Sequence, residues 1–452
     1  MEQNLTATPE PRVGAVNPPH HTDIRTARRV IVAAALGNFV EWFDYGVYGF
    51  LAATIAKVFF PGTDPTTQII AAIGVFGVGF LIRPIGAIIF GSHADKHGRK
   101  PVMLFTVVLM SGATFLIGVL PTYQAIGLWA PALLIVIRLL QGIGAGGEVG
   151  SVTVVLSEAA PPRRRGFAGS MSPVSSFMAF LTASTLVLLL NVSLTPDQLE
   201  AWGWRIPFLL SLPLGFVGLL LRWRLEETVP FKQLVDENRV SPAPVREVFR
   251  KSPGAMLVMG GITATTAVGL WMLVTYMTSF LSNTVGLTGT QSILTTVLGV
   301  AAALLFTLLG GVLSDRFGRR RMLIITTSLL VVFVYPCFLL ATTGNLPSAI
   351  AGLILFGALL GLFDGGFTAA AAELFPTRYR TAGVALPFNV GAAIFGGGVP
   401  YASAWLVQAT GNQQAGAWLV ILAAAISLLA AIAIPAATHG RFLAGRPLDA
   451  ND

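Results

Sequence analysis

The chain has 452 residues, of which 54% are hydrophobic and only 11% are charged. Because a soluble globular domain carries roughly 25% charged residues, this composition excludes a water-soluble chain. The net charge of +8 suits nucleic acid, but we expect no nucleic-acid partner, since the basic residues are distributed as membrane topology requires. The single cysteine, Cys337, excludes an intramolecular disulfide and a cysteine metal cluster.

Residues 1–27 are polar and contain several prolines, so we expect a disordered cytoplasmic tail there. Beyond this tail, twelve apolar runs approach or exceed the roughly 20 residues that cross a bilayer. An even number of crossings puts both termini on the same side of the membrane. The expected helices occupy residues 28–54, 68–91, 101–120, 130–157, 167–190, 205–224, 255–281, 290–313, 322–342, 348–374, 381–408 and 416–437.

The basic residues give this topology a direction. Of the 29 Lys and Arg residues, we assign Lys57 and Arg205 to outer loops, Arg83 and Arg138 to helices, and the rest to tails and inner loops. Because Lys and Arg concentrate on the cytoplasmic side of membrane proteins, both termini are predicted to be cytoplasmic. The chain is therefore expected in the plasma (inner) membrane, and we expect a bacterial source.

The chain contains an internal repeat. The sequence GSHADKHGRK at 91–100 recurs as GVLSDRFGRR at 311–320, and the spacing E-x2-P-x3-R at 158–165 recurs at 373–380. Because both motifs recur in the same order and after nearly the same interval, they indicate a duplicated six-helix unit. The predicted organisation is an N-terminal bundle at 28–224, a cytoplasmic central loop at 225–254, a C-terminal bundle at 255–438 and a cytoplasmic tail at 439–452.

The repeated pattern G-x3-D-[RK]-x-G-R-[KR] resembles the signature loop of the major facilitator superfamily, and with the twelve helices the resemblance covers nearly the whole chain. It implies an all-α membrane protein built from two pseudo-symmetric six-helix bundles. The aspartates of the loops are able to cap helix ends, and the glycines allow close packing. We expect a clasp that gates the inner side, with topology anchoring as the alternative. The gating candidates are Gly91, Asp95, Gly98, Arg99, Gly311, Asp315, Gly318 and Arg319.

A narrower resemblance concerns the metabolite–proton symporter branch of this superfamily. It is carried by GNFVEWFDYGVYG at 37–49, KVFFPG at 57–62, FLIRPIG at 80–86, WGWRIPF at 202–208 and LEET at 225–228. Members of this branch carry proline and betaine, 2-oxoglutarate, citrate or shikimate. TYM at 275–277 and FN at 388–389 add a resemblance to bacterial proline/betaine transporters. The long charged C-terminal coiled coil of the osmosensing members has no counterpart before Asp452, so osmotic activation stays open.

Two carboxylates lie halfway along the first predicted helix. Glu41 and Asp44 are spaced i,i+3 and share one face. A charge at the bilayer centre costs at least roughly 2.5–3.5 kcal/mol, and two close carboxylates cannot both ionise cheaply in a low dielectric. We therefore predict that they carry the coupled proton. The alternative is a structural ion pair with an arginine of a neighbouring helix.

Arg138 begins the sequence RLLQG in the fourth helix, which resembles a motif of proton-coupled superfamily members. Its guanidinium could clamp a substrate carboxylate or pair with one of the helix-one carboxylates, and Gln141 belongs to the same motif. A purely structural bridge is the alternative. Aromatic side chains suit a quaternary ammonium through cation–π attraction, although ordinary packing also explains them. The other substrate-binding candidates are Tyr48, Trp271, Tyr276 and Asn389.

Three further charges fall within predicted helices. Glu148 and Asp364 occupy corresponding positions in the fourth and tenth helices, beside paired glycines. We predict a gating or packing role for them rather than substrate contact. Arg83 precedes Pro84 near the inner end of the second helix and is a gating candidate, or it snorkels to the interface. The run at 396–400, GGGVP, is expected to weaken the eleventh helix.

Together these features predict a proton-coupled symporter of a small polar organic metabolite. The substrate would be a zwitterion such as proline or betaine, or a carboxylate such as 2-oxoglutarate. No nucleophile–base pair or metal cluster lies at membrane depth, so we expect neither an enzyme nor a metal site, and no cofactor besides the coupling proton. The partners would be the substrate, the proton and the bilayer, with the monomer functional. An exporter or a uniporter without proton symport is the alternative.

Overall fold

The computed structural model describes residues 24–62 and 65–434. The predicted tail at 439–452 lies outside these residues, and so does the tail at 1–27 except for residues 24–27, which already belong to the first helix. The described residues form helices, turns and loops, with no strand among them. This is expected in hydrocarbon, where a helix satisfies its backbone hydrogen bonds within the segment.

The N-terminal half contains ten α-helices in the described chain. They are α1 (Ile24–Phe50), α2 (Ala52–Phe59), α3 (Pro65–His97), α4 (Arg99–Val119), α5 (Tyr123–Ile126), α6 (Trp129–Ala159), α7 (Arg165–Ser193), α8 (Pro196–Gln198), α9 (Arg205–Leu209) and α10 (Ser211–Trp223). The C-terminal half is preceded by α11 (Val229–Asp236) and α12 (Pro244–Lys251). It contains α13 (Pro253–Trp271), α14 (Met277–Asn283), α15 (Gly289–Phe317), α16 (Arg319–Ala341), α17 (Leu346–Glu373), α18 (Arg380–Phe395), α19 (Val399–Thr410) and α20 (Gly416–Ala433).

Among the described residues, 12 helical stretches are long and apolar enough to cross a membrane, which confirms the predicted fold class. Some of these stretches are interrupted. A π-helical turn at Met272–Tyr276 separates α13 from α14. The predicted weak point in the eleventh stretch is confirmed as a break, because α18 ends at Phe395 and α19 begins at Val399.

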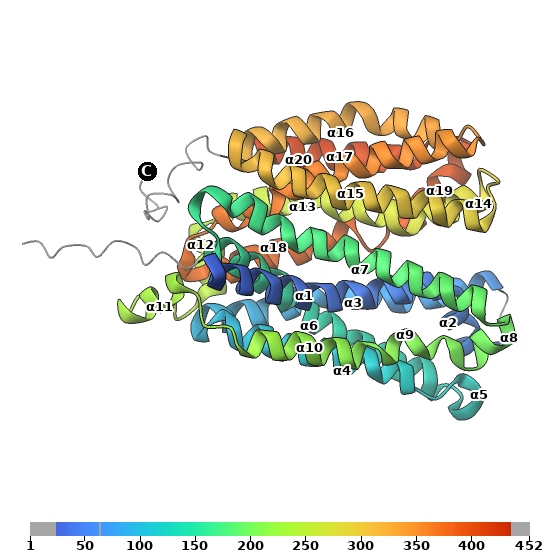
Figure 1. Ribbon diagram of the computed structural model, residues 1–452, viewed down its shortest axis with the longest axis horizontal. Coiled ribbons are helices and arrows are strands. Elements are labelled where there is room, and N and C mark those ends of the chain that lie inside the picture. The colour runs from blue at the N-terminus through green and yellow to red at the C-terminus, as the bar shows by residue number, and fades with distance from the viewer. Residues whose placement is uncertain (1–23, 63–64, 435–452) are drawn as a thin grey trace, which may run out of the picture.

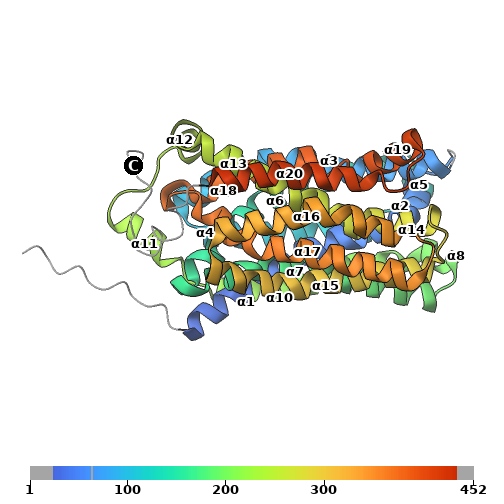
Figure 2. The ribbon, with the colours of Figure 1, turned by 90° about the horizontal axis from the view of Figure 1, so that it is seen from above.

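The two halves lie side by side, and the long helices of both run roughly parallel to the long axis of the molecule (Figure 1). The contact between them involves α7, which packs against α15 and α17, and α18, which packs against α3 and α6. The central loop forms α11 and α12 at one end of the bundle (Figures 1 and 2). The two signature loops lie at this same end, which we call the clasp end.

Candidate functional site

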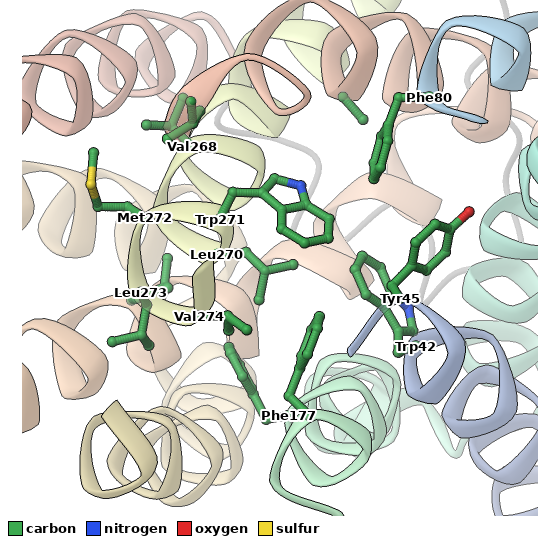
Figure 3. Packing of buried hydrophobic residues seen from close by; sticks show 14 of the residues in the cluster. Trp42, Tyr45, Phe80, Phe177, Val268, Leu270, Trp271, Met272, Leu273 and Val274 are labelled. Atoms are coloured by element: carbon green, nitrogen blue, oxygen red, sulfur yellow. The ribbon is translucent and has the colours of Figure 1, made fainter. Parts of the chain in front are cut away.

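A layer of aromatic rings joins the two halves near the middle of the bundle. Trp271 is the last residue of α13, and its ring centroid lies 5.3 Å from that of Phe80, 5.4 Å from Phe76 and 6.5 Å from Trp42. Figure 3 shows the indole of Trp271 facing Trp42 and Phe80 across the contact. The side chain is 4% exposed, so the indole of Trp271 is packed between the two halves.

The first ion pair behind this layer joins α1 to α3. A nitrogen of the Arg83 guanidinium lies 3.2 Å from Glu41 Oε1, and both side chains are buried. The guanidinium also lies 4.7 Å from the Tyr45 ring centroid and 4.6 Å from that of Phe80. The alternative that Arg83 snorkels to the interface is therefore wrong, because its charge is satisfied inside the bundle. Glu41 Oε2 is buried without a hydrogen-bond partner.

The second ion pair joins α1 to α6. Arg138 donates to Asp44 Oδ2 over 2.9 Å and to Gln141 Oε1 over 2.8 Å. Gln141 in turn donates to the hydroxyl of Thr114, which orients the amide oxygen toward the arginine. The Arg138 guanidinium lies 3.8 Å above the ring centroid of Tyr48. Asp44 Oδ1 and one terminal nitrogen of Arg138 are buried without a partner.

Each helix-one carboxylate therefore faces an arginine of its own. Both carboxylates form ion pairs with arginines of neighbouring helices, as the alternative interpretation predicted. Their role in proton coupling stays a prediction. A paired carboxylate that keeps an unpartnered oxygen is able to take a proton on that oxygen without first losing a hydrogen bond.

The third ion pair joins α10 to α6. The sequence does not predict it. Arg222 on α10 pairs with Glu148, which also accepts from the Thr106 hydroxyl. The sequence predicts an inner loop for Arg222, and this prediction is wrong because the residue lies in α10. Its place inside the apolar run 205–224 was the signal that this charge needed a buried partner. Glu148 therefore pairs within its own half.

Asp95 and Asp315 each cap a helix of the opposite half. Asp95 accepts from two backbone amides at the start of α18, over 3.1 and 2.8 Å. Asp315 accepts from two amides at the start of α7, over 2.8 and 2.9 Å. The N-terminus of a helix presents unpaired N–H groups and a positive dipole end, so these contacts join the two halves at the clasp end. The gating role of the signature loops stays a prediction.

The arginines of the signature loops add salt bridges at the clasp end. Arg99 lies 3.7 Å from Asp95 and 3.6 Å from Glu158. Arg319 repeats the arrangement with distances of 2.9 Å to Asp315 and 3.4 Å to Glu373. A further salt bridge of 2.7 Å between Arg380 and Glu158 crosses from one half to the other.

The signature glycines have two structural tasks. Gly98 and Gly318 have φ angles of 105° and 92°, a backbone conformation that favours glycine. At Gly91, an added Cβ would lie 3.0 Å from the Cα of Ala382, and at Gly311 it would lie 2.7 Å from the hydroxyl of Ser170. These two positions therefore allow the halves to approach closely.

A central cavity of about 50 Å³ lies between the aromatic layer and the clasp end. Both halves line it, with Asn38, Trp42, Ser176 and Phe177 from the first half and Asp364 and Phe388 from the second. A cavity of this volume has room for water or a small solute group. A second cavity of about 200 Å³, lined by Tyr45, Phe50 and Ser279 among others, lies on the opposite side of the aromatic layer.

None of the residues predicted to bind substrate belongs to the described lining of the central cavity. Asn389 donates to the carbonyl of Gly146 over 3.0 Å and so bridges the two halves. Tyr276 stacks on Phe280, with ring centroids 5.2 Å apart. Arg138 is instead engaged by Asp44.

Known proteins are similar to this chain in sequence and in fold. Residues 34–386 and 259–444 match the family model of the Major Facilitator Superfamily. The proline/betaine transporter of Escherichia coli K12 is 37% identical over 434 residues, covering 94% of this chain and 86% of the relative. The citrate-proton symporter of Klebsiella pneumoniae is 36% identical over 404 residues, covering 88% and 90%.

Two further similarities extend the comparison. The alpha-ketoglutarate permease of Escherichia coli K12 is 37% identical over 419 residues, covering 91% of this chain and 95% of the relative. The solved structure of the proton:xylose symporter XylE has a TM-score of 0.76 at 16% identity, covering 94% of this chain and 97% of that one. At that identity the likeness shows a shared fold. The chain therefore belongs to the Major Facilitator Superfamily, as a multi-pass transporter with twelve membrane-spanning helices.

Proposed function

We propose that this protein is a secondary transporter that moves a small polar organic metabolite inward together with one or more protons. The observation that carries the proposal is the buried Asp44–Arg138 pair, which holds a titratable carboxylate against a guanidinium at the middle of the bundle. The Glu41–Arg83 pair is a second such unit. A relative that is a citrate-proton symporter supports proton coupling.

The pair offers a direct exchange of charges. While Asp44 is ionised, it engages Arg138; a proton on Asp44 removes that attraction and frees the guanidinium for an anionic group of the substrate. The exchange leaves no buried charge uncompensated, which would otherwise be costly. Gln141 and the ring of Tyr48 act as positioning groups that hold the guanidinium in place during it.

The clasp end would act as the gate of an alternating-access cycle. Opening that end requires Asp95 and Asp315 to leave the helix ends that they cap, and it requires the Arg380–Glu158 bridge to break. We infer that the clasp end faces the cytoplasm, because the Lys and Arg residues concentrate in the loops and tails of that side.

The test is uptake into proteoliposomes of glycine betaine, proline, 2-oxoglutarate, citrate and shikimate, with and without an inward proton gradient. We expect at least one solute to accumulate only with the gradient. Asp44→Asn should abolish accumulation but keep exchange of internal for external substrate, and Arg138→Gln should abolish both. Asp236→Asn, the same change at an exposed site on α11, is the matched control.

Two results would contradict proton symport. Uptake that only equilibrates, whatever the gradient, indicates a uniporter. Solute that leaves the vesicles in exchange for entering protons indicates an exporter.

A further inference from the structure

We propose that Asp364, with the aromatic rings around the central cavity, forms a subsite for the positively charged end of a zwitterionic substrate. The inference rests on the proposed function and narrows its substrate class. It selects zwitterions that carry an organic cation, such as betaines and imino acids, over citrate and other substrates with several carboxylates.

The first observation is the electrostatic setting of Asp364. Its side chain comes from α17, lines the central cavity and is 2% exposed. Asp364 Oδ1 accepts a hydrogen bond of 2.6 Å from the hydroxyl of Thr266. Within residues 24–62 and 65–434, the carboxylate has no salt bridge to a lysine or arginine, and no other ionisable side chain lines this cavity. A buried carboxylate is costly unless something compensates its charge.

The corresponding position of the N-terminal half provides a comparison. Glu148 occupies it on α6, and Arg222 from the last helix of that half neutralises it. The last helix of the C-terminal half, α20, contains no lysine or arginine over Gly416–Ala433. Among the residues that the structure describes, Glu148 thus has a cationic partner and Asp364 has none, so we infer that the counter-charge of Asp364 comes from the transported molecule.

The second observation is the chemistry of the surrounding wall. Trp42 and Phe177 line the cavity from the first half, and Phe367 and Phe388 line it from the second. The ring centroids of Phe367 and Phe388 are 6.1 Å apart. Aromatic faces attract alkylated ammonium groups, whereas a small metal cation prefers several oxygen ligands. One carboxylate among aromatic rings therefore suits an organic cation.

The same setting disfavours substrates with several negative charges. A tricarboxylate in this cavity would lie beside Asp364 with no cation in the described lining to offset the repulsion. A zwitterion with one carboxylate instead presents its cationic end to Asp364.

The experiment is equilibrium binding to the purified full-length protein, by titration calorimetry at constant pH and without a proton gradient. The ligands are glycine betaine, choline, which has the cation but no carboxylate, and citrate. We expect glycine betaine to bind, choline to bind more weakly, and citrate not to bind. Asp364→Asn should lower the affinity for betaine and choline at least tenfold, and Asp364→Glu should retain part of it.

Two further variants make this measurement specific. Asp236→Asn is the matched control on exposed α11 and should leave both affinities unchanged. If Asp364→Asn does not fold, as judged by its unfolding midpoint, Phe388→Leu tests the subsite through its aromatic wall. This variant should weaken the binding of both quaternary ammonium ligands several-fold.

The outcomes separate this inference from the proposed function. Unchanged binding of betaine and choline by Asp364→Asn, even with accumulation lost, would assign Asp364 to proton movement and overturn the subsite. Gradient-driven accumulation of citrate but not betaine would also overturn the subsite, while symport stands. Asp364-dependent binding of betaine without any gradient-driven uptake would keep the subsite and refute symport.

Discussion

At the residue scale, three of the described carboxylates in the membrane-spanning helices are neutralised in the same way, by a buried arginine. Glu41, Asp44 and Glu148 each face an arginine that comes from a different helix. Removing one partner of a buried pair leaves the other charge unpaired in a low dielectric, and this costs more than the pair itself contributes. Asp364 differs because no lysine or arginine among the described residues pairs with it, and the proposed cation subsite rests on this difference.

Arg222→Met should lower the free energy of unfolding by about 3–5 kcal/mol, because Glu148 is then buried without its counter-charge. The double variant Arg222→Met with Glu148→Gln should recover most of this loss. Denaturant unfolding of the purified protein in one detergent measures both. Lys57→Met is the control, since the Lys57–Glu200 pair has side chains 59% and 37% exposed and should be worth at most about 1 kcal/mol. A loss in Arg222→Met as small as in the control would contradict the argument.

At the scale of elements, the junction between α3 and α4 depends on a glycine. Gly98 has a φ angle of 105°, and a Cβ there would lie 2.3 Å from Glu227 Oε2. Gly98→Ala should therefore destabilise the protein by about 1–2 kcal/mol or more, through the unfavourable backbone conformation. Gly77→Ala is the control, because that helical glycine has open space around it and alanine favours a helix. A lowered unfolding midpoint only in Gly98→Ala is the expected result, and equal midpoints would contradict it.

The docking of α12 is expected to depend on pH. Burial raises the pKa of Glu247, but hydrogen bonds from Ser241 and Arg378, with the charge of Arg378, outweigh it and hold the pKa below its ordinary value of 4.5. The nitrogen–oxygen distance to Arg378 is 2.6 Å. A carboxyl with a lowered folded-state pKa stabilises the docked form above its unfolded pKa, and this contribution is lost as pH falls.

Hydrogen-exchange protection of residues 244–251, corrected for intrinsic rates, should therefore be higher near about pH 7 than near about pH 4. Glu247→Gln should lower protection at the higher pH and remove most of the difference between the two. A pH dependence that persists unchanged in Glu247→Gln would show that another group controls the docking of α12.

At the scale of the whole molecule, the proposed gate is the set of contacts that Asp95 and Asp315 make between the halves at the clasp end. Removing the charge from both with Asp95→Asn and Asp315→Asn should weaken the capping of α18 and α7 and favour a form open at the clasp end. A single Ser176→Cys in a Cys337→Ala background places a thiol in the lining of the central cavity. Its labelling by an impermeant maleimide from the clasp side should become several-fold faster in the double variant.

The same labelling in Asp236→Asn should match that of the parent, because this exposed aspartate caps no helix of the other half. An unchanged labelling rate in the double variant would show that other contacts, such as the Arg380–Glu158 bridge, are sufficient to keep the clasp end closed.

The sequence by itself determined the fold, because apolar length and a duplicated loop are local properties that lipid converts into helices. The distribution of basic residues adds a prediction of orientation. The sequence also located Glu41, Asp44 and Arg138, since any charge in an apolar run is conspicuous. Only the tertiary structure decided the partners. Whether Arg83 leaves the bundle or pairs with Glu41, and whether Glu148 faces Arg222 or the other half, depends on helix rotation and crossing, which packing between distant segments controls.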